Sequence, residues 1–189
     1  MLQRAFKILL FVIILYNTVW ATLDENVSQY IEDRWHSPAM DKIMAVPNFV
    51  SSVLGISLGN LSVFYLGQEK EVATAKLAIT AWGFSAGTTF LLKAAFNRPR
   101  PSNTDMPRYN SSFPSGHTAS WFSQAIIYSA KYPRLTIPLY VFGAFVGLSR
   151  IYYGEHYFTD VLAGAAVGSI AGYMTLKLEN HLRKIPFLR

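Results

Sequence analysis

The 189-residue sequence contains no cysteine and little charge. Without cysteine, the chain forms no disulfide and no thiolate metal site. Charged residues make up 15% of the chain, whereas they make up about a quarter of an ordinary soluble domain. The net charge is +6, but no lysine-rich block or basic helix is present, which argues against a nucleic-acid-binding protein. The scarcity of charge instead favours a membrane protein.

Internal repeats, low-complexity tracts and linkers are also missing, so the length predicts one domain. Long uncharged runs recur at Ile8–Leu23, Ile43–Gln68, Leu77–Leu92, Thr118–Ala130, Leu135–Ser149 and Val161–Leu176. A membrane-spanning helix needs about 20 apolar residues, and only Ile43–Gln68 reaches that length easily. The other runs can cross if flanking residues such as Lys76 and Lys177 extend the helices toward the interface. We therefore predict an all-α fold, a transmembrane bundle of six helices.

The charges between the runs indicate how the chain crosses the membrane. If the N-terminus is cytoplasmic and each run crosses once, every cytoplasmic piece carries lysine or arginine, as the positive-inside rule expects. These pieces are MLQRAFK, EKEVATAK, KYPR and ENHLRKIPFLR. The segments Lys93–His117 and Ser149–Asp160 are then expected on the outer side.

The first run fits two interpretations. Arg4 and Lys7, then ILLFVIILY, then Ala21 describe either an uncleaved anchor or a cleavable signal peptide. We assign residues 1–22 to this anchor or signal peptide and residues 23–189 to one domain. Cleavage would leave a bundle of five helices.

Two further patterns concern helix packing. Segment Asp24–Lys42 predicts an amphipathic helix at the membrane interface, because apolar residues recur in it at helical spacing, namely Val27, Tyr30, Ile31 and Trp35. Glycines four residues apart allow close helix contact in lipid. They predict that the last two runs pack tightly on each other, through Gly143, Gly147, Gly164, Gly168 and Gly172.

A first polar stretch, LLKAAFNRPRPSN, follows the third run. Lys93 ends the run, and Arg98 and Arg100 follow within RPRP. Because each proline fixes φ and makes the preceding residue extended, the helix stops here and the arginines lie on a stiff segment. Cations at a helix end also serve as interfacial anchors, so this stretch alone does not decide its role.

A second stretch, SSFPSGHTASW, begins the next run. Ser115 can cap the helix, and Gly116 allows close backbone approach. The N–H groups and dipole of a helix start bind anions, and His117 lies in the first turn beside them. Taken alone, the stretch is equally well a plain helix start.

The third stretch, SRIYYGEHYFTD, lies between the last two runs. His156 and Asp160 are four residues apart, so on a helix they share one face and can form a hydrogen bond. The aspartate would fix the imidazole tautomer and leave the other nitrogen free as nucleophile or base. Arg150 at the end of the preceding run suits phosphate oxygens. Glu155 is expected to tune His156 or to face solvent.

With alternating spans, Lys93, His117, Arg150 and His156 all emerge on one side. Cations, a helix N-terminus and two histidines around one point form a site for a phosphoryl group. One histidine can attack phosphorus while the other protonates the leaving alcohol. The cations and N–H groups stabilise the oxygens, so no metal is required, and no carboxylate cluster suited to magnesium is present.

The three stretches resemble the signature of the type 2 phosphatidic acid phosphatase (PAP2) superfamily, which is K-x6-RP, PSGH and SR-x5-H-x3-D. The six-residue spacing from Lys93 selects Arg100 and not Arg98 for the first part. The resemblance implies that His156 is the nucleophile that forms a phosphohistidine, oriented by Asp160. It implies that His117 is the general acid. The phosphate ligands would be Lys93, Arg100, Ser115, Gly116 and Arg150, with no metal and no cofactor.

The resulting expectation is a metal-independent phosphatase of the PAP2 type. Its substrate would be a membrane lipid phosphate or diphosphate, and its site would face the outside of a bacterial inner membrane. Alternatives are a soluble periplasmic acid phosphatase or a haloperoxidase of the same superfamily, a lipid phosphotransferase, and a non-catalytic lipid-binding protein. The modest mean hydropathy of +0.22 keeps the soluble alternatives open. His36 and His181 match no motif and are expected to have no catalytic role. The sequence leaves the lipid and the oligomeric state open.

Overall fold

The helices of this protein form one bundle, and the three polar stretches lie at one end of it. The computed structural model describes residues 21–31, 33–102, 107–182 and 184. These residues contain helices and no strand, which confirms the all-α prediction. The predicted anchor or signal peptide lies, apart from its last two residues, outside the described part of the chain.

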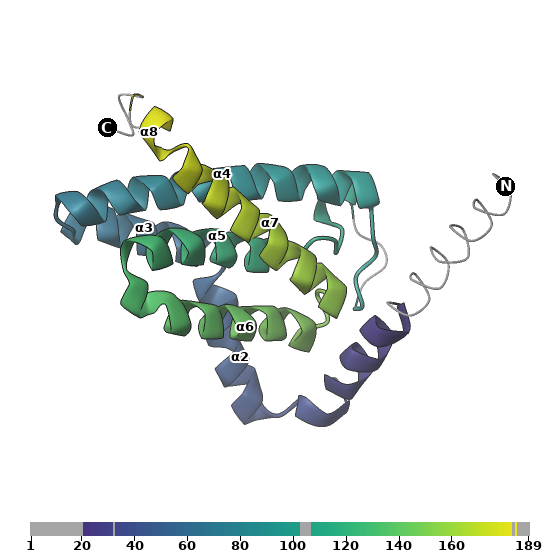
Figure 1. The fold of residues 1–189 in the computed structure, drawn as a ribbon. Coiled ribbons are helices and arrows are strands. Elements are labelled where there is room, and N and C mark those ends of the chain that lie inside the picture. The colour runs from purple at the N-terminus through teal and green to yellow at the C-terminus, as the bar shows by residue number, and fades with distance from the viewer. Residues whose placement is uncertain (1–20, 32, 103–106, 183, 185–189) are drawn as a thin grey trace, which may run out of the picture.

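Residues 21–31 and 33–35 are helical and precede α2. The helices that follow are α2 (Pro38–Val50), α3 (Val53–Leu66), α4 (Glu69–Phe96), α5 (Gly116–Lys131), α6 (Thr136–Tyr152), α7 (Phe158–Lys177) and α8 (Glu179–Leu182), with short 3₁₀ turns η1 (Arg108–Asn110) and η2 (Pro133–Leu135). In Figure 1, α4, α5 and α6 run beside one another and α7 crosses them diagonally. The predicted runs Thr118–Ala130, Leu135–Ser149 and Val161–Leu176 lie within α5, within η2 and α6, and within α7.

The run Ile43–Gln68, which we expected to cross once, is divided between two helices. α2 and α3 are bent by 59° at their junction. The hydroxyl of Ser51 donates to the carbonyl of Pro47 at 2.7 Å and ends α2. The hydroxyl of Ser52 accepts from the N–H of Gly55 at 3.1 Å and begins α3. Serine side chains that satisfy backbone groups locally thus replace the continuous helix that hydropathy indicated.

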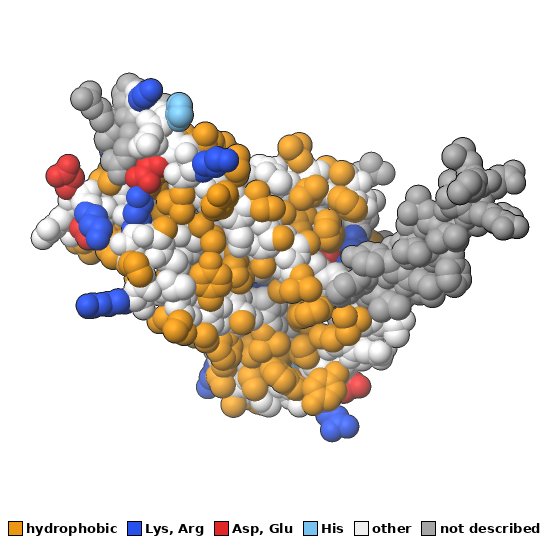
Figure 2. Space-filling view, in the orientation of Figure 1, with side chains coloured by type: hydrophobic (Ala, Val, Ile, Leu, Met, Phe, Trp, Pro, Cys, Tyr) orange, Lys and Arg blue, Asp and Glu red, His pale blue; other side chains and the backbone are white. Residues whose placement is uncertain are grey.

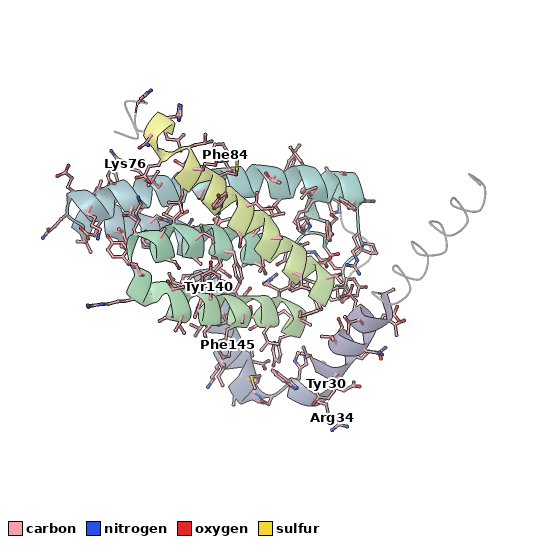
Figure 3. All side chains as sticks on the ribbon, in the orientation of Figure 1. Tyr30, Arg34, Lys76, Phe84, Tyr140 and Phe145 are labelled. Atoms are coloured by element: carbon pink, nitrogen blue, oxygen red, sulfur yellow. The ribbon has the colours of Figure 1, made fainter. Side chains whose placement is uncertain are left out.

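Segment Asp24–Lys42 also differs from the single interfacial helix that we expected. The helix ends before His36, and Ser37 caps α2 by accepting from the N–H of Met40 at 3.2 Å. Much of its apolar side is covered by protein, because Val27, Ile31 and Trp35 belong to a cluster with Met44, Ile151 and Tyr152. Tyr30 and Arg34 project away from the bundle (Figure 3). The segment therefore packs across the end of α6.

The segment EKEVATAK, residues 69–76, was expected to connect two spans. The structure places it in the first turns of α4, which begins at Glu69. Acidic residues in the first turn suit the positive end of the helix dipole. Charge in this piece therefore marks a helix start.

The glycines of α7 pack against α5 and not against α6. A Cβ atom on Gly168 would lie 2.1 Å from the carbonyl oxygen of Ala119, and one on Gly164 would lie 2.4 Å from that of Ser115. Contact between α6 and α7 is much smaller than contact between α5 and α7. The prediction that the last two runs pack tightly on each other was therefore wrong for the glycines of α7, whereas Gly147 of α6 does approach α7, since a Cβ atom there would lie 2.5 Å from Val161. Close packing on α5 brings the start of α7 beside the PSGH stretch.

The outer surface is rich in exposed apolar side chains. They cover much of the face in Figure 2, whereas charged side chains gather at the end of the bundle where α8 lies. Pro133–Tyr152 is long and apolar enough to cross a bilayer, and the bent pair α2 and α3 passes the same test together. Broad exposed apolar surface is unfavourable in water and typical of a lipid-facing protein.

We expect Gly168→Ala to lower the free energy of unfolding by roughly 1–3 kcal/mol, since its methyl group overlaps the backbone of α5. Thermal unfolding in detergent measures the change. Gly83→Ala on α4 is the matched control, because nothing lies within 4 Å of a Cβ atom there. Equal melting temperatures for the two variants would contradict the close contact between α5 and α7.

Candidate active site

Four helix ends meet at one end of the bundle. α4 and α6 end there with Lys93 and Arg150 in their last turns, and α5 and α7 begin there. Because these helices alternate in direction, motifs far apart in sequence come together. His117, in the first turn of α5, lines one cavity together with Lys93.

Three cations of this site are almost wholly buried. Lys93, Arg100 and Arg150 are 8%, 9% and 6% exposed. Such burial is costly unless the charged groups form hydrogen bonds. Lys93 donates to the carbonyl of Ser111, whose hydroxyl donates back to the Lys93 carbonyl at 2.8 Å.

Both arginines are fixed by asparagine. Arg100 donates from Nε to the carbonyl of Asn110 at 3.1 Å and from Nη2 to its Oδ1 at 2.7 Å. Arg150 donates from Nη1 to Oδ1 of Asn48. Neutral amide and carbonyl oxygens thus orient these cations without cancelling their charge. The arrangement suits an anion.

Arg98 and Arg100 point to different partners. Arg98 donates from Nη1 to Oδ1 of Asp160 at 2.7 Å and from Nη2 to Oδ2 of Asp24 at 2.7 Å. Asp24 also accepts from the N–H of Thr159 at 2.9 Å. Arg98 therefore ties the start of α7 to the N-terminal helix, while Arg100 belongs to the group of buried cations.

The PSGH stretch begins α5, as the sequence indicated. The Ser115 hydroxyl accepts from the N–H of Thr118 at 3.5 Å, a long capping contact, and the Ser115 N–H donates to the carbonyl of Asp160 at 2.9 Å. A Cβ atom on Gly116 would meet only Thr89, at 3.8 Å. The space beside the helix start is therefore open.

His156 and Asp160 do not share a helix face, because His156 precedes α7, whose N-cap is Tyr157. The Asp160 carboxylate accepts from the N–H of Tyr157 at 2.9 Å through Oδ2 and from Arg98 through Oδ1. His156 Nδ1 lies 3.8 Å from Oδ2 of Asp160, which is an ion-pair distance and too long for a hydrogen bond. The expected hydrogen bond is thus replaced by a longer contact.

Burial decides the charge of His156, which is 2% exposed. Burial lowers its pKa to about 4, Asp160 opposes the shift, and the charges of Lys93 and Arg150 add to it. At neutral pH the imidazole is therefore uncharged, which is the nucleophilic form.

A cavity of about 220 Å³ opens beside the charged groups. Lys93, Gly116 and His117 line its polar side, while α3 and α4 form its apolar side through Val53, Trp82, Ala86 and Phe90. Such a cavity offers a charged end for a head group and an apolar wall for a hydrocarbon chain. Among the described residues, no group of three or more His, Cys, Asp or Glu is placed to hold a metal ion.

The family model described as the PAP2 superfamily matches residues 74–184, more than half of the chain. The chain belongs to the PAP2 superfamily. It is 27% identical over 161 residues to undecaprenyl-diphosphatase BcrC of Bacillus subtilis, covering 81% of each chain. It is 39% identical over 84 residues to the lipid A 1-phosphatase of Porphyromonas gingivalis, but this match covers 42% of the chain and only 18% of that relative.

The fold also matches a solved PAP2 protein. The transmembrane PAP2 type phosphatidylglycerolphosphate phosphatase of Bacillus subtilis superposes with a TM-score of 0.68 at 21% identity, covering 95% of this chain and 97% of the other. The likeness shows a shared fold, and Pro133–Tyr152 is long and apolar enough to cross a membrane.

All signature positions lie inside the PAP2 match, but two supporting residues lie before it. Asp24 holds Arg98, and Asn48 holds Arg150. Sequence reasoning missed both, along with Asn110, because they follow no motif. Asp24 contacts a residue 74 positions away and Asn48 one 102 positions away.

The lowered pKa of His156 predicts a pH-dependent stability. An unfolded histidine gains its proton near pH 6.5, whereas the folded one does so near pH 4. Between these values protons favour the unfolded state, so stability falls as pH falls through this window, by up to about 3 kcal/mol. We expect His156→Gln to reduce the loss of melting temperature between pH 7 and pH 4.5 in detergent. Parallel curves for the two proteins would show that His156 is not buried in its neutral form.

Proposed function

We propose that this PAP2 protein hydrolyses the phosphate or diphosphate of a membrane lipid through a phosphohistidine intermediate. The observation that carries the proposal is a group of three buried cations at the end of the bundle where His117 and His156 lie, next to an apolar cavity that Lys93 and His117 line. A head group bound by the cations would place its hydrocarbon chain along the apolar wall.

The chemistry follows from the positions of these groups. Lys93, Arg100 and Arg150, together with the N–H groups at the start of α5, would bind the phosphoryl oxygens. Nδ1 of His156 lies next to Asp160, which leaves Nε2 to attack phosphorus. The Nε2–P bond forms while the P–O bond to the lipid breaks.

Proton transfer falls to the second histidine. His117 would donate a proton to the departing lipid oxygen and then remove one from the water that attacks the phosphohistidine. Hydrolysis regenerates His156 and leaves inorganic phosphate. The cations and N–H groups stabilise the charge on the transferred group, so the scheme requires no metal.

Membrane orientation forms part of the proposal. The end of the bundle opposite the site carries several basic residues at helix ends, including Lys70, Lys131, Arg134 and Lys177. The positive-inside rule places that end in the cytoplasm. The site would then face the outside of a bacterial inner membrane, and residues 1–22 would serve as an anchor or a signal peptide that delivers the domain there.

We expect His156→Ala to abolish phosphate release and His117→Ala to lower it by roughly 10²–10⁴, the usual contribution of a general acid. His181→Ala, an exposed substitution on α8, is the matched control and should retain activity. Phosphate release in detergent measures all three, after membrane extraction has shown equal insertion. An active His156→Ala variant would disprove the role of the nucleophile.

The lipid is identified by a second experiment. Phosphate release is measured with undecaprenyl diphosphate, phosphatidylglycerophosphate, phosphatidate and a lipid A phosphate, with a water-soluble aryl phosphate as the control. We expect at least one lipid to exceed the aryl phosphate, with EDTA present and no acceptor lipid added. Loss of activity in EDTA would contradict the metal-free scheme, and dependence on an acceptor would identify a phosphotransferase.

A further inference from the structure

Glu155 lies against two of the cations that would bind phosphate. Its Oε2 contacts Nη1 of Arg100 and lies 3.6 Å from Nη2 of Arg150. The two arginine side chains are 10% and 7% exposed, whereas that of Glu155 is 34% exposed. A carboxylate therefore lies where the proposed mechanism requires the phosphoryl oxygens.

The turn between α6 and α7 places this carboxylate. Gly154 adopts a φ of +62°, which a residue with a side chain rarely tolerates. The N–H groups of Glu155 and His156 then both donate to the carbonyl of Arg150, at 3.1 and 3.2 Å. The residue just before the proposed nucleophile is thereby directed back toward the arginines.

Of Arg100, Arg150 and Glu155, only Glu155 is free to move away from the site. Arg100 is fixed by Asn110, and Arg150 by Asn48. Glu155 is one-third exposed, so another rotamer can place its carboxylate in water when a phosphate takes its place. An arriving phosphate needs the same guanidinium N–H groups, because carboxylate and phosphate use them in the same way.

We infer that Glu155 competes internally with phosphate for Arg100 and Arg150. It neutralises the arginines while the site is empty, a lipid phosphate displaces it, and its return helps to release the inorganic phosphate product. Glu155 thus weakens the binding of every oxyanion that uses these arginines. The inference rests on the proposed function for its biological role, but the competition itself can be measured without turnover.

A purely structural role for Glu155 predicts the opposite result. If Glu155 only held the two arginines in place, its loss would loosen them and weaken phosphate binding. If it competes, its loss frees them and strengthens binding. The sign of the change therefore separates the two roles.

The test measures the Kd of inorganic phosphate and of vanadate by calorimetry on the full chain in detergent. We expect Glu155→Gln, which keeps the size and removes the charge, to lower both Kd values roughly two- to tenfold, as for a partly exposed ion pair. Glu69→Gln is the matched control, because it makes the same change of charge on an exposed residue at the far end of α4. Its Kd should equal that of the unchanged protein. An equal or higher Kd in Glu155→Gln would overturn the inference.

Lipid hydrolysis separates this inference from the proposed function. In the lipid hydrolysis assay, added phosphate should inhibit Glu155→Gln at a lower concentration than it inhibits the unchanged protein. The ratio of the two concentrations should equal the ratio of the two Kd values. Tighter phosphate binding in a protein that releases no phosphate from any lipid would reject the proposed function and leave the competition standing. Hydrolysis by the unchanged protein without tighter binding in Glu155→Gln would reject the competition alone.

Discussion

The carboxylate and carbonyl of Asp160 hold the parts of this site together. One carboxylate oxygen accepts from Arg98 and the other from the N–H of Tyr157, while the carbonyl accepts from the N–H of Ser115. A single residue thus joins the RPRP segment, the start of α7 and the start of α5. The side chain is completely buried. Loss of any of these hydrogen bonds would leave a buried polar group unpaired, which costs more stability than it would in water.

Concentrated positive charge is the second constraint on the structure. Lys93, Arg100 and Arg150 lie almost out of reach of water, and their neutral partners orient them without compensating their charge. Such a group of cations binds anions tightly. When no anion is bound, its buried and unpaired charges are unfavourable in free energy. The Glu155 carboxylate lies on a short exposed turn, where it reduces the positive charge of the site while no phosphate is bound. It can still move away when phosphate arrives.

The N-terminal part of the chain supports the site although it lies before the family match. Asp24 reaches Arg98, and Asn48 at the end of α2 reaches Arg150. The bend between α2 and α3 ends α2 just beyond Asn48, which lies beside the end of α6. The segment that looked like a membrane span and an interfacial helix therefore also fixes two arginines of the PAP2 domain.

The sequence by itself determined the helical class, most helix limits around the site, and the residues that converge there. Those features are local, because proline and serine signals end and begin helices, and motif spacing places Lys93, His117 and His156 at helix ends. Tertiary structure decided which arginine meets which acid, that α7 packs on α5, that α2 and α3 bend apart, and that Glu155 turns inward. Each of these depends on contacts between segments distant in sequence, and such contacts leave no periodic pattern in the chain.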